Sequence, residues 1–132
     1  MATILDHIRS LESYVERSGA RLVRSPLPES VHGRVFRDLI MLRADLDPEQ
    51  ELLTLVHELT HWLTHRDPCI QHLCTVFEYE AEAVEALVMA RLGLQSSSVQ
   101  TADGDNPTDG LLSASVKRVV WASSRICDAL GV

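Results

Sequence analysis

The sequence predicts a small α+β domain, and three features of the chain support this fold class. Four segments have the composition and apolar spacing of helices: 3–18, 47–66, 77–93 and 112–130. Short apolar runs between the first two segments, broken by proline and glycine, predict a short antiparallel sheet. The length of 132 residues suits a single domain, 1–132, with a core of its own.

Composition and charge exclude several classes of protein. The chain is 45% hydrophobic and 23% charged, which is typical of globular domains. A formal net charge of −7, with one lysine and scattered arginines, argues against direct binding of nucleic acid. We find no signal-peptide pattern at the N-terminus and no apolar run long enough to cross a membrane. Three cysteines at no familiar spacing indicate reduced thiols, so we expect a cytoplasmic protein.

The N-terminal helix is predicted to serve packing. Thr3 and Asp6 resemble a capping pair, and Gly19 suits the helix end. The apolar residues that recur at helical spacing are Ile4, Leu5, Ile8, Leu11 and Val15.

Two or three short antiparallel strands are predicted between residues 20 and 46. The apolar runs are Leu22–Val23, Val35–Phe36 and Leu39–Leu42. Arg37–Asp38 suits a tight turn between the second and third runs, which indicates a hairpin.

The next helix has clear start and stop signals. Asp47 can cap it, Pro48 suits the first helical position and Gln50 completes a capping box. Asp67–Pro68 predicts an end near Arg66, because the residue before a proline disfavours helix.

This helix contains a His-Glu-x-x-His motif at residues 57–61. The four-residue spacing places His57 and His61 on one helix face, where both imidazoles can reach one zinc ion. Glu58 lies about 100° round the helix from His57, where its carboxylate could take a proton from water beside the ion. The alternative is a pair of hydrogen-bonded histidines on an amphipathic helix; the acidic residues downstream favour the metal site.

His65 lies four residues beyond His61 but is not expected to be a third ligand. Two further turns rotate it about 80° from His57, which is poor geometry for three ligands on one straight helix. We expect His65 at the end of the helix, lining the cleft.

The third ligand is instead expected from the glutamate-rich helix at 77–93. At about 100° per residue, Glu78, Glu82 and Glu85 share one face. Glu80 points nearly opposite, so we expect no role for it. Acidic stripes are usually solvated, but this one begins seventeen residues after the motif, within reach of the same ion. From spacing alone, Glu78 or Glu82 could be the ligand.

The motifs His57-Glu58-Leu59-Thr60-His61 and Glu78-x-x-Ala81-Glu82 resemble those of the ImmA/IrrE family of zinc metallopeptidases, over roughly residues 33–94. They are also similar to the zincin half of ArdC-type antirestriction proteins. The resemblance implies a zincin-like fold in which Glu78 is the third zinc ligand. It also implies that Glu82, where Asn or Asp is more usual, supports the site by orienting a histidine.

Two segments follow the site. The polar residues 95–110 are expected to be disordered or to form a mobile flap near the cleft. The helix predicted at 112–130 places Trp121 off its apolar stripe, at the periphery or on a partner surface. The residues expected to face inward are Leu112, Val116, Val119, Val120, Ile126 and Leu130.

The sequence therefore predicts a zinc-dependent endopeptidase. Two histidines and one glutamate leave a fourth zinc position open, which favours catalysis over a structural role. Glu58 would act as general base in the attack of water on a peptide carbonyl. Candidates for stabilising the oxyanion are Tyr79, His65 and His72.

The expected partner is a protein substrate. In zinc peptidases an edge strand beside the cleft commonly binds the substrate backbone, and one of the predicted strands could do so. Members of the ImmA/IrrE family typically act on helix-turn-helix repressors, so the resemblance implies a transcriptional regulator as substrate. The alternative is a zinc-binding regulatory, toxin–antitoxin or antirestriction module that holds its partner without cutting it.

Overall fold

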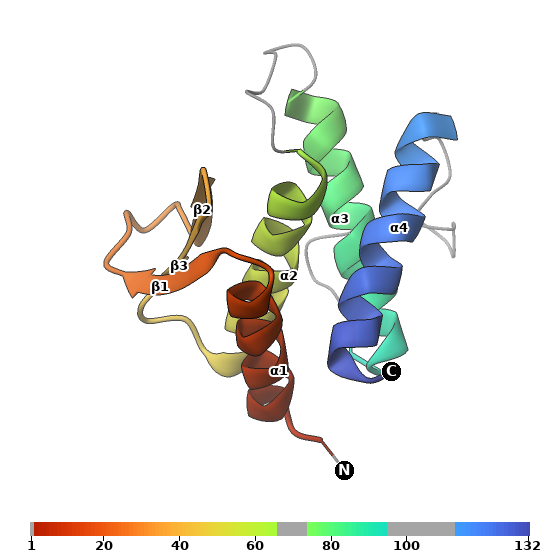
Figure 1. Cartoon of the computed structure of the whole chain (residues 1–132). Coiled ribbons are helices and arrows are strands. Elements are labelled where there is room, and N and C mark those ends of the chain that lie inside the picture. The colour runs from red at the N-terminus through yellow and green to blue at the C-terminus, as the bar shows by residue number, and fades with distance from the viewer. Residues whose placement is uncertain (1, 66–73, 95–112) are drawn as a thin grey trace.

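Four helices and one three-stranded sheet make up the part of the chain that the structure, a computed structural model, describes: residues 2–65, 74–94 and 113–132 (Figure 1). In chain order the elements are α1 (Ile4–Arg17), β1 (Arg21–Ser25), β2 (Gly33–Phe36), β3 (Leu39–Arg43), α2 (Pro48–Thr64), α3 (Cys74–Arg91) and α4 (Ser113–Leu130). The predicted α+β class is confirmed. His72 and the segment 95–110 lie outside the described residues.

The predicted starts of α1 and α2 are confirmed, but the capping box expected at α2 has only its Asp47 half, and α3 begins at Cys74, before the predicted residue 77. At α1, the Thr3 hydroxyl accepts from the Asp6 N–H at 3.1 Å, and the Asp6 carboxylate accepts from the Thr3 N–H at 2.9 Å. At α2, the Asp47 carboxylate accepts from the Gln50 N–H at 2.9 Å, and Pro48 occupies the first turn. These caps use backbone donors that have no partner within the helix.

The sheet has the strand order β1-β3-β2, and only one of its two pairings is antiparallel. β2 and β3 form the predicted hairpin, with Arg37 at a φ of 55° in the turn. β1 pairs with β3 in parallel, from Arg21 opposite Leu39 to Ser25 opposite Arg43. The expectation of a wholly antiparallel sheet is therefore wrong. After β1 the chain crosses to β2 at the opposite edge of the sheet. The hairpin then returns it as β3, which lies between β2 and β1 and runs parallel to β1.

Helix α2 is the centre of the fold. It contacts α1, α3, α4, β2 and β3, and Figure 1 shows it between the sheet with α1 and the pair α3–α4. Its apolar residues Leu52, Leu55, Val56 and Leu59 are fully buried. The motif on this helix is therefore held from both sides by packed elements.

On α4 the inward face differs slightly from the predicted stripe. Val120 is 51% exposed, so its predicted inward position is wrong, whereas Trp121 lies off the buried face as expected. The buried face is rotated relative to the predicted one because it includes Ser115 and Ala122, small residues that the apolar pattern does not identify. Its buried members are Ser115, Val119, Ala122, Ile126 and Leu130.

Among the described residues, no helix is long and apolar enough to cross a membrane.

Candidate metal centre

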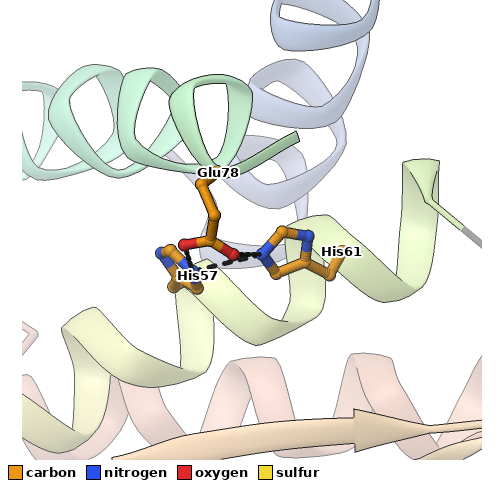
Figure 2. A group of neighbouring side chains, drawn as sticks. All are labelled: His57, His61 and Glu78. Atoms are coloured by element: carbon orange, nitrogen blue, oxygen red, sulfur yellow. Dashed lines mark hydrogen bonds and ion pairs between the residues drawn. The ribbon is translucent and has the colours of Figure 1, made fainter. Parts of the chain in front are cut away.

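Three side chains from two helices converge on one point. His57 and His61 extend from α2, and Glu78 descends from α3 between them (Figure 2). The two Nε2 atoms lie 3.2 Å apart, and the Glu78 carboxylate oxygens lie 3.2 Å from His57 Nε2 and 2.8 Å from His61 Nε2. The structure thus brings together the three residues that the sequence suggested as ligands.

This donor set fits zinc. In a tetrahedral site with bonds of about 2.0–2.1 Å, neighbouring ligand atoms lie about 3.3 Å apart. The separations of His57 Nε2 from His61 Nε2 and from Glu78, both 3.2 Å, are close to that value, and the separation of His61 Nε2 from Glu78, 2.8 Å, is shorter. Two imidazoles and one carboxylate also match a common catalytic zinc set, with one position left for water or substrate. The role of these residues as zinc ligands stays a prediction.

Glu85 is the partner of His57 at its second ring nitrogen, Nδ1. The Glu85 carboxylate contacts His57 Nδ1, the ring nitrogen on the side away from the convergence point. An N–H at Nδ1 leaves the lone pair at Nε2 free for a metal, so Glu85 holds the ring in a metal-binding tautomer. The Glu85 side chain is 3% exposed and that of His57 is 19% exposed, so the contact is partly buried.

The orienting role expected of Glu82 is therefore wrong, because Glu85 makes that contact. Glu82 is not among the three converging residues either. The α2 and α3 helices run antiparallel: His57, before His61 on α2, meets Glu85, after Glu78 on α3. Nδ1 lies on the side of the His57 ring that faces away from Glu78. It therefore meets Glu85, two turns beyond Glu78 on α3, and not Glu82, one turn beyond.

The contact between His57 and Glu78 shifts the pKa values of both groups. Burial alone would lower the pKa of His57, but hydrogen bonds to Glu78 and Glu85 outweigh burial and raise it to about 10, so a metal ion that binds Nε2 must displace a proton from it. The same contacts with His57 and His61 lower the pKa of Glu78. Glu78 is therefore ionised at neutral pH, as a carboxylate ligand must be.

Glu58 lies beside these groups in a more buried position. It is 9% exposed, and burial raises the pKa of its carboxyl. A raised pKa moves a carboxylate toward the range in which it can take and return a proton near neutral pH. His57 and His61 act in the opposite sense on the Glu58 pKa, which places both imidazoles within electrostatic reach of it.

Strand β2 packs directly against Glu58 through Gly33. A Cβ built on Gly33 would lie 2.8 Å from Glu58 Cγ and 2.7 Å from Thr54 Cγ2. Both distances are shorter than real Cβ contacts, so only glycine lets the strand approach α2 this closely.

We expect Gly33→Ala to displace Glu58 or the strand. Overpacking of this kind costs typically about 1–3 kcal/mol of stability, and because Glu58 is the general base expected from the sequence, its displacement should also lower the expected peptidase activity. The measurement is a denaturant unfolding curve together with an activity assay, with Arg34→Ala in the same strand as control. Parental stability and activity in Gly33→Ala would show that the contact is not tight.

The open side of the centre is formed by α3. The Glu78 side chain is 56% exposed, whereas those of His57 and His61 are 19% and 17% exposed. A hollow of about 490 Å³ lies beside it; among the described residues it is lined by Thr75, Glu78, Tyr79 and Glu82. Tyr79 is 59% exposed at this hollow. Its role in stabilising an oxyanion stays a prediction.

His65 does not line the cleft, and its proposed oxyanion role is wrong. Its side chain is 3% exposed, and both ring nitrogens already have partners: His61 Nδ1 at 2.9 Å and Glu80 Oε1 at 2.8 Å. The ring also stacks on Phe77, with centroids 4.1 Å apart. His65 can turn back toward His61 because α2 ends at Thr64, so the straight-helix projection no longer applies to it.

Glu80 has partners that the sequence analysis missed. It points away from the acidic stripe as predicted, but it is 1% exposed and accepts hydrogen bonds from Ser115 and Arg118 on α4. The signal was the position of Glu80 on the helix face opposite the acidic stripe, where a carboxylate faces the core and needs a charged partner. No spacing in the sequence identifies Arg118 as that partner.

Comparison with known families matches residues 15–94 to the family described as the IrrE N-terminal-like domain, peptidase M78. The match covers more than half of the chain and includes His57, Glu58, His61 and Glu78. It ends before α4, which supplies Ser115 and Arg118. Comparison with curated proteins and with solved structures finds no match.

Proposed function

The chain belongs to the IrrE N-terminal-like family of M78 metallopeptidases, and we propose that it is a zinc-dependent endopeptidase that hydrolyses a peptide bond in a protein partner. One observation carries the proposal. The Nε2 atoms of His57 and His61 and the Glu78 carboxylate converge at zinc-ligand spacing, next to a buried Glu58.

Each residue has a defined part in the reaction. His57, His61 and Glu78 would hold the ion, and bound zinc supplies a Lewis acid for the scissile carbonyl and the attacking water. Glu58 accepts a proton from the water as its oxygen attacks the carbonyl carbon. When the C–N bond breaks, Glu58 returns that proton to the nitrogen of the leaving amine.

We expect strand β2 to bind the substrate backbone. It is an edge strand, and its Gly33 packs against Glu58. The Arg43 N–H donates to the His32 carbonyl, so the neighbouring residues Gly33 and Val35 direct their backbone groups away from β3. An extended peptide pairing with those groups would lie alongside the general base.

The substrate we propose is a helix-turn-helix repressor in the cytoplasm. The support is the resemblance of the two motifs to the ImmA/IrrE family, whose members typically act on such repressors. The net charge of −7 argues against the alternative of contacting DNA directly, so regulation would pass through the protein partner.

The first test concerns the metal. We expect the purified protein to carry about one zinc per chain, because three ligands from two packed helices form one site. Elemental analysis of the protein as purified, and after stripping and reconstitution, measures this. A protein that holds no zinc and takes none up on reconstitution would exclude the proposed mechanism.

The second test concerns the substrate. Incubation with candidate helix-turn-helix repressors should give a defined cleavage product by mass spectrometry, and a zinc chelator should abolish it. Repressors that bind but stay intact would favour the alternative, a regulatory module that holds its partner without cutting it.

A further inference from the structure

A chain of hydrogen bonds runs from His61 to the C-terminal helix. His61 Nδ1 lies 2.9 Å from His65 Nδ1, and His65 Nε2 lies 2.8 Å from Glu80 Oε1. Glu80 in turn accepts from Arg118 Nε at 2.8 Å and Nη2 at 2.7 Å, and from the Ser115 hydroxyl. The chain therefore connects α2, α3 and α4.

The geometry sets the direction of each hydrogen bond in this chain. The Glu80 carboxylate meets Arg118 in a two-pronged contact, so Glu80 is an acceptor and His65 donates to it from Nε2. A histidine that binds a metal through Nε2 carries its hydrogen at Nδ1. His61 Nδ1 therefore donates to His65 Nδ1, the ring nitrogen that the bond to Glu80 leaves with a lone pair.

This arrangement leaves the lone pair of His61 at Nε2, the atom 2.8 Å from Glu78 at the convergence point. The other histidine is held in the same tautomer, by the contact of Glu85 with His57 Nδ1. Both imidazoles thus present Nε2 to the ion, one held directly by a carboxylate and the other through a second histidine.

The two central members of this chain, His65 and Glu80, are buried and fully bonded. The His65 side chain is 3% exposed and that of Glu80 1% exposed, and Phe77 stacks on the His65 ring. Arg118 meets both oxygens of Glu80 in a two-pronged contact, the geometry in which arginine holds a carboxylate best. His65 therefore has little freedom to rotate away from His61.

We propose that His65, Glu80 and Arg118 are positioning residues that hold His61 in its zinc-binding tautomer, so that α4 contributes to zinc affinity. The inference rests on the zinc-binding part of the proposed function and not on peptidase activity. It extends the site beyond the family match at 15–94, because Arg118 lies on α4. It also replaces the earlier expectation that Glu80 has no role.

The test is zinc affinity, measured by competition with a chromophoric chelator. His65→Phe keeps an aromatic ring against Phe77 and removes both hydrogen bonds, so we expect zinc affinity to fall by about 10–100-fold. His65→Gln offers an amide oxygen to His61 and an amide N–H to Glu80. It should bind zinc within about threefold of the parent, since it restores both hydrogen bonds.

Arg118→Ala has a matched control in Arg24→Ala. Their side chains are 38% and 39% exposed, and Arg24 likewise bonds carboxylates on neighbouring elements, Glu12 and Glu51. We expect Arg118→Ala to weaken zinc binding by about tenfold and Arg24→Ala to leave it unchanged, even if both lower the unfolding midpoint.

The outcomes separate this inference from the proposed function. Parental zinc affinity in His65→Phe, no recovery in His65→Gln, or equal loss in Arg24→Ala and Arg118→Ala would each overturn the inference. A parent protein that binds zinc but cleaves no partner would remove the peptidase and leave the inference standing. A parent that binds no zinc would overturn both.

Discussion

Glu58→Gln is expected to abolish peptidase activity while the protein still binds zinc. Glutamine has nearly the same shape as glutamate, so the contact with Gly33 and the burial of the side chain are retained. It cannot accept a proton from water, and loss of a general base typically costs about 10²–10⁴-fold in rate. Zinc content and cleavage rate, measured on the same preparation, test this expectation.

The matched control is Glu49→Gln in the first turn of the same helix. It makes the same change in net charge at an exposed position, distant from the motif in sequence. We expect Glu49→Gln to cleave at the parental rate. A Glu58→Gln protein that cleaves a verified substrate as fast as the parent would show that Glu58 is not the base. If the parent and Glu58→Gln both bind the partner and neither cleaves it, the non-catalytic module becomes the better interpretation.

The second large effect is expected at the glutamates of α3. Glu78→Ala removes a carboxylate whose oxygens lie beside both Nε2 atoms, so zinc affinity should fall by more than 100-fold. Glu85→Ala removes the partner of His57 Nδ1 and should cost about 10–100-fold, the usual effect of losing such a residue. Glu82→Ala serves as matched control from the same helix face and should remain close to the parent.

Chelator titrations of the three variants give the order directly. Each variant removes one negative charge from the same helix, so a general loss of electrostatic attraction for the cation would affect all three alike. If Glu82→Ala proves the weakest binder, the third ligand is one turn further along α3 and Glu78 becomes the supporting residue. Equal losses in Glu82→Ala and Glu85→Ala would show that the contact of Glu85 with His57 does not orient the ring.

The local elements could be predicted from the sequence because their causes are local. Thr3, Asp6 and Asp47 mark helix starts with side chains that cap backbone groups within three residues, and the structure shows each of these hydrogen bonds. The hairpin turn at Arg37–Asp38 follows from the two apolar runs beside it. The sheet pairing did not follow, because apolar runs of two to four residues are too short to show the alternation that distinguishes antiparallel from parallel strands.

The converging residues could also be predicted, for a similar reason. His57 and His61 share a face through helical periodicity alone, and Glu58 is fixed beside them by the same geometry. Bringing Glu78 to them required one further step, the resemblance of the two motifs to a known family. The resemblance identified Glu78 as the residue of α3 that meets the two histidines. It did not identify the residue that holds either histidine ring through Nδ1.

What the sequence by itself determined, then, is the α+β class, the helix that bears the motif and the three residues that meet at its face. Only the tertiary structure decided which acids hold the two histidines. Glu85 reaches His57 because α2 and α3 run antiparallel, and their packing places His57 Nδ1 beside residue 85 of α3. Glu80 is bound to Arg118, 38 residues away in sequence, because α4 packs against α3. Contacts between separate elements depend on how the helices are rotated against each other in the packed core, and no periodicity within one element encodes that rotation.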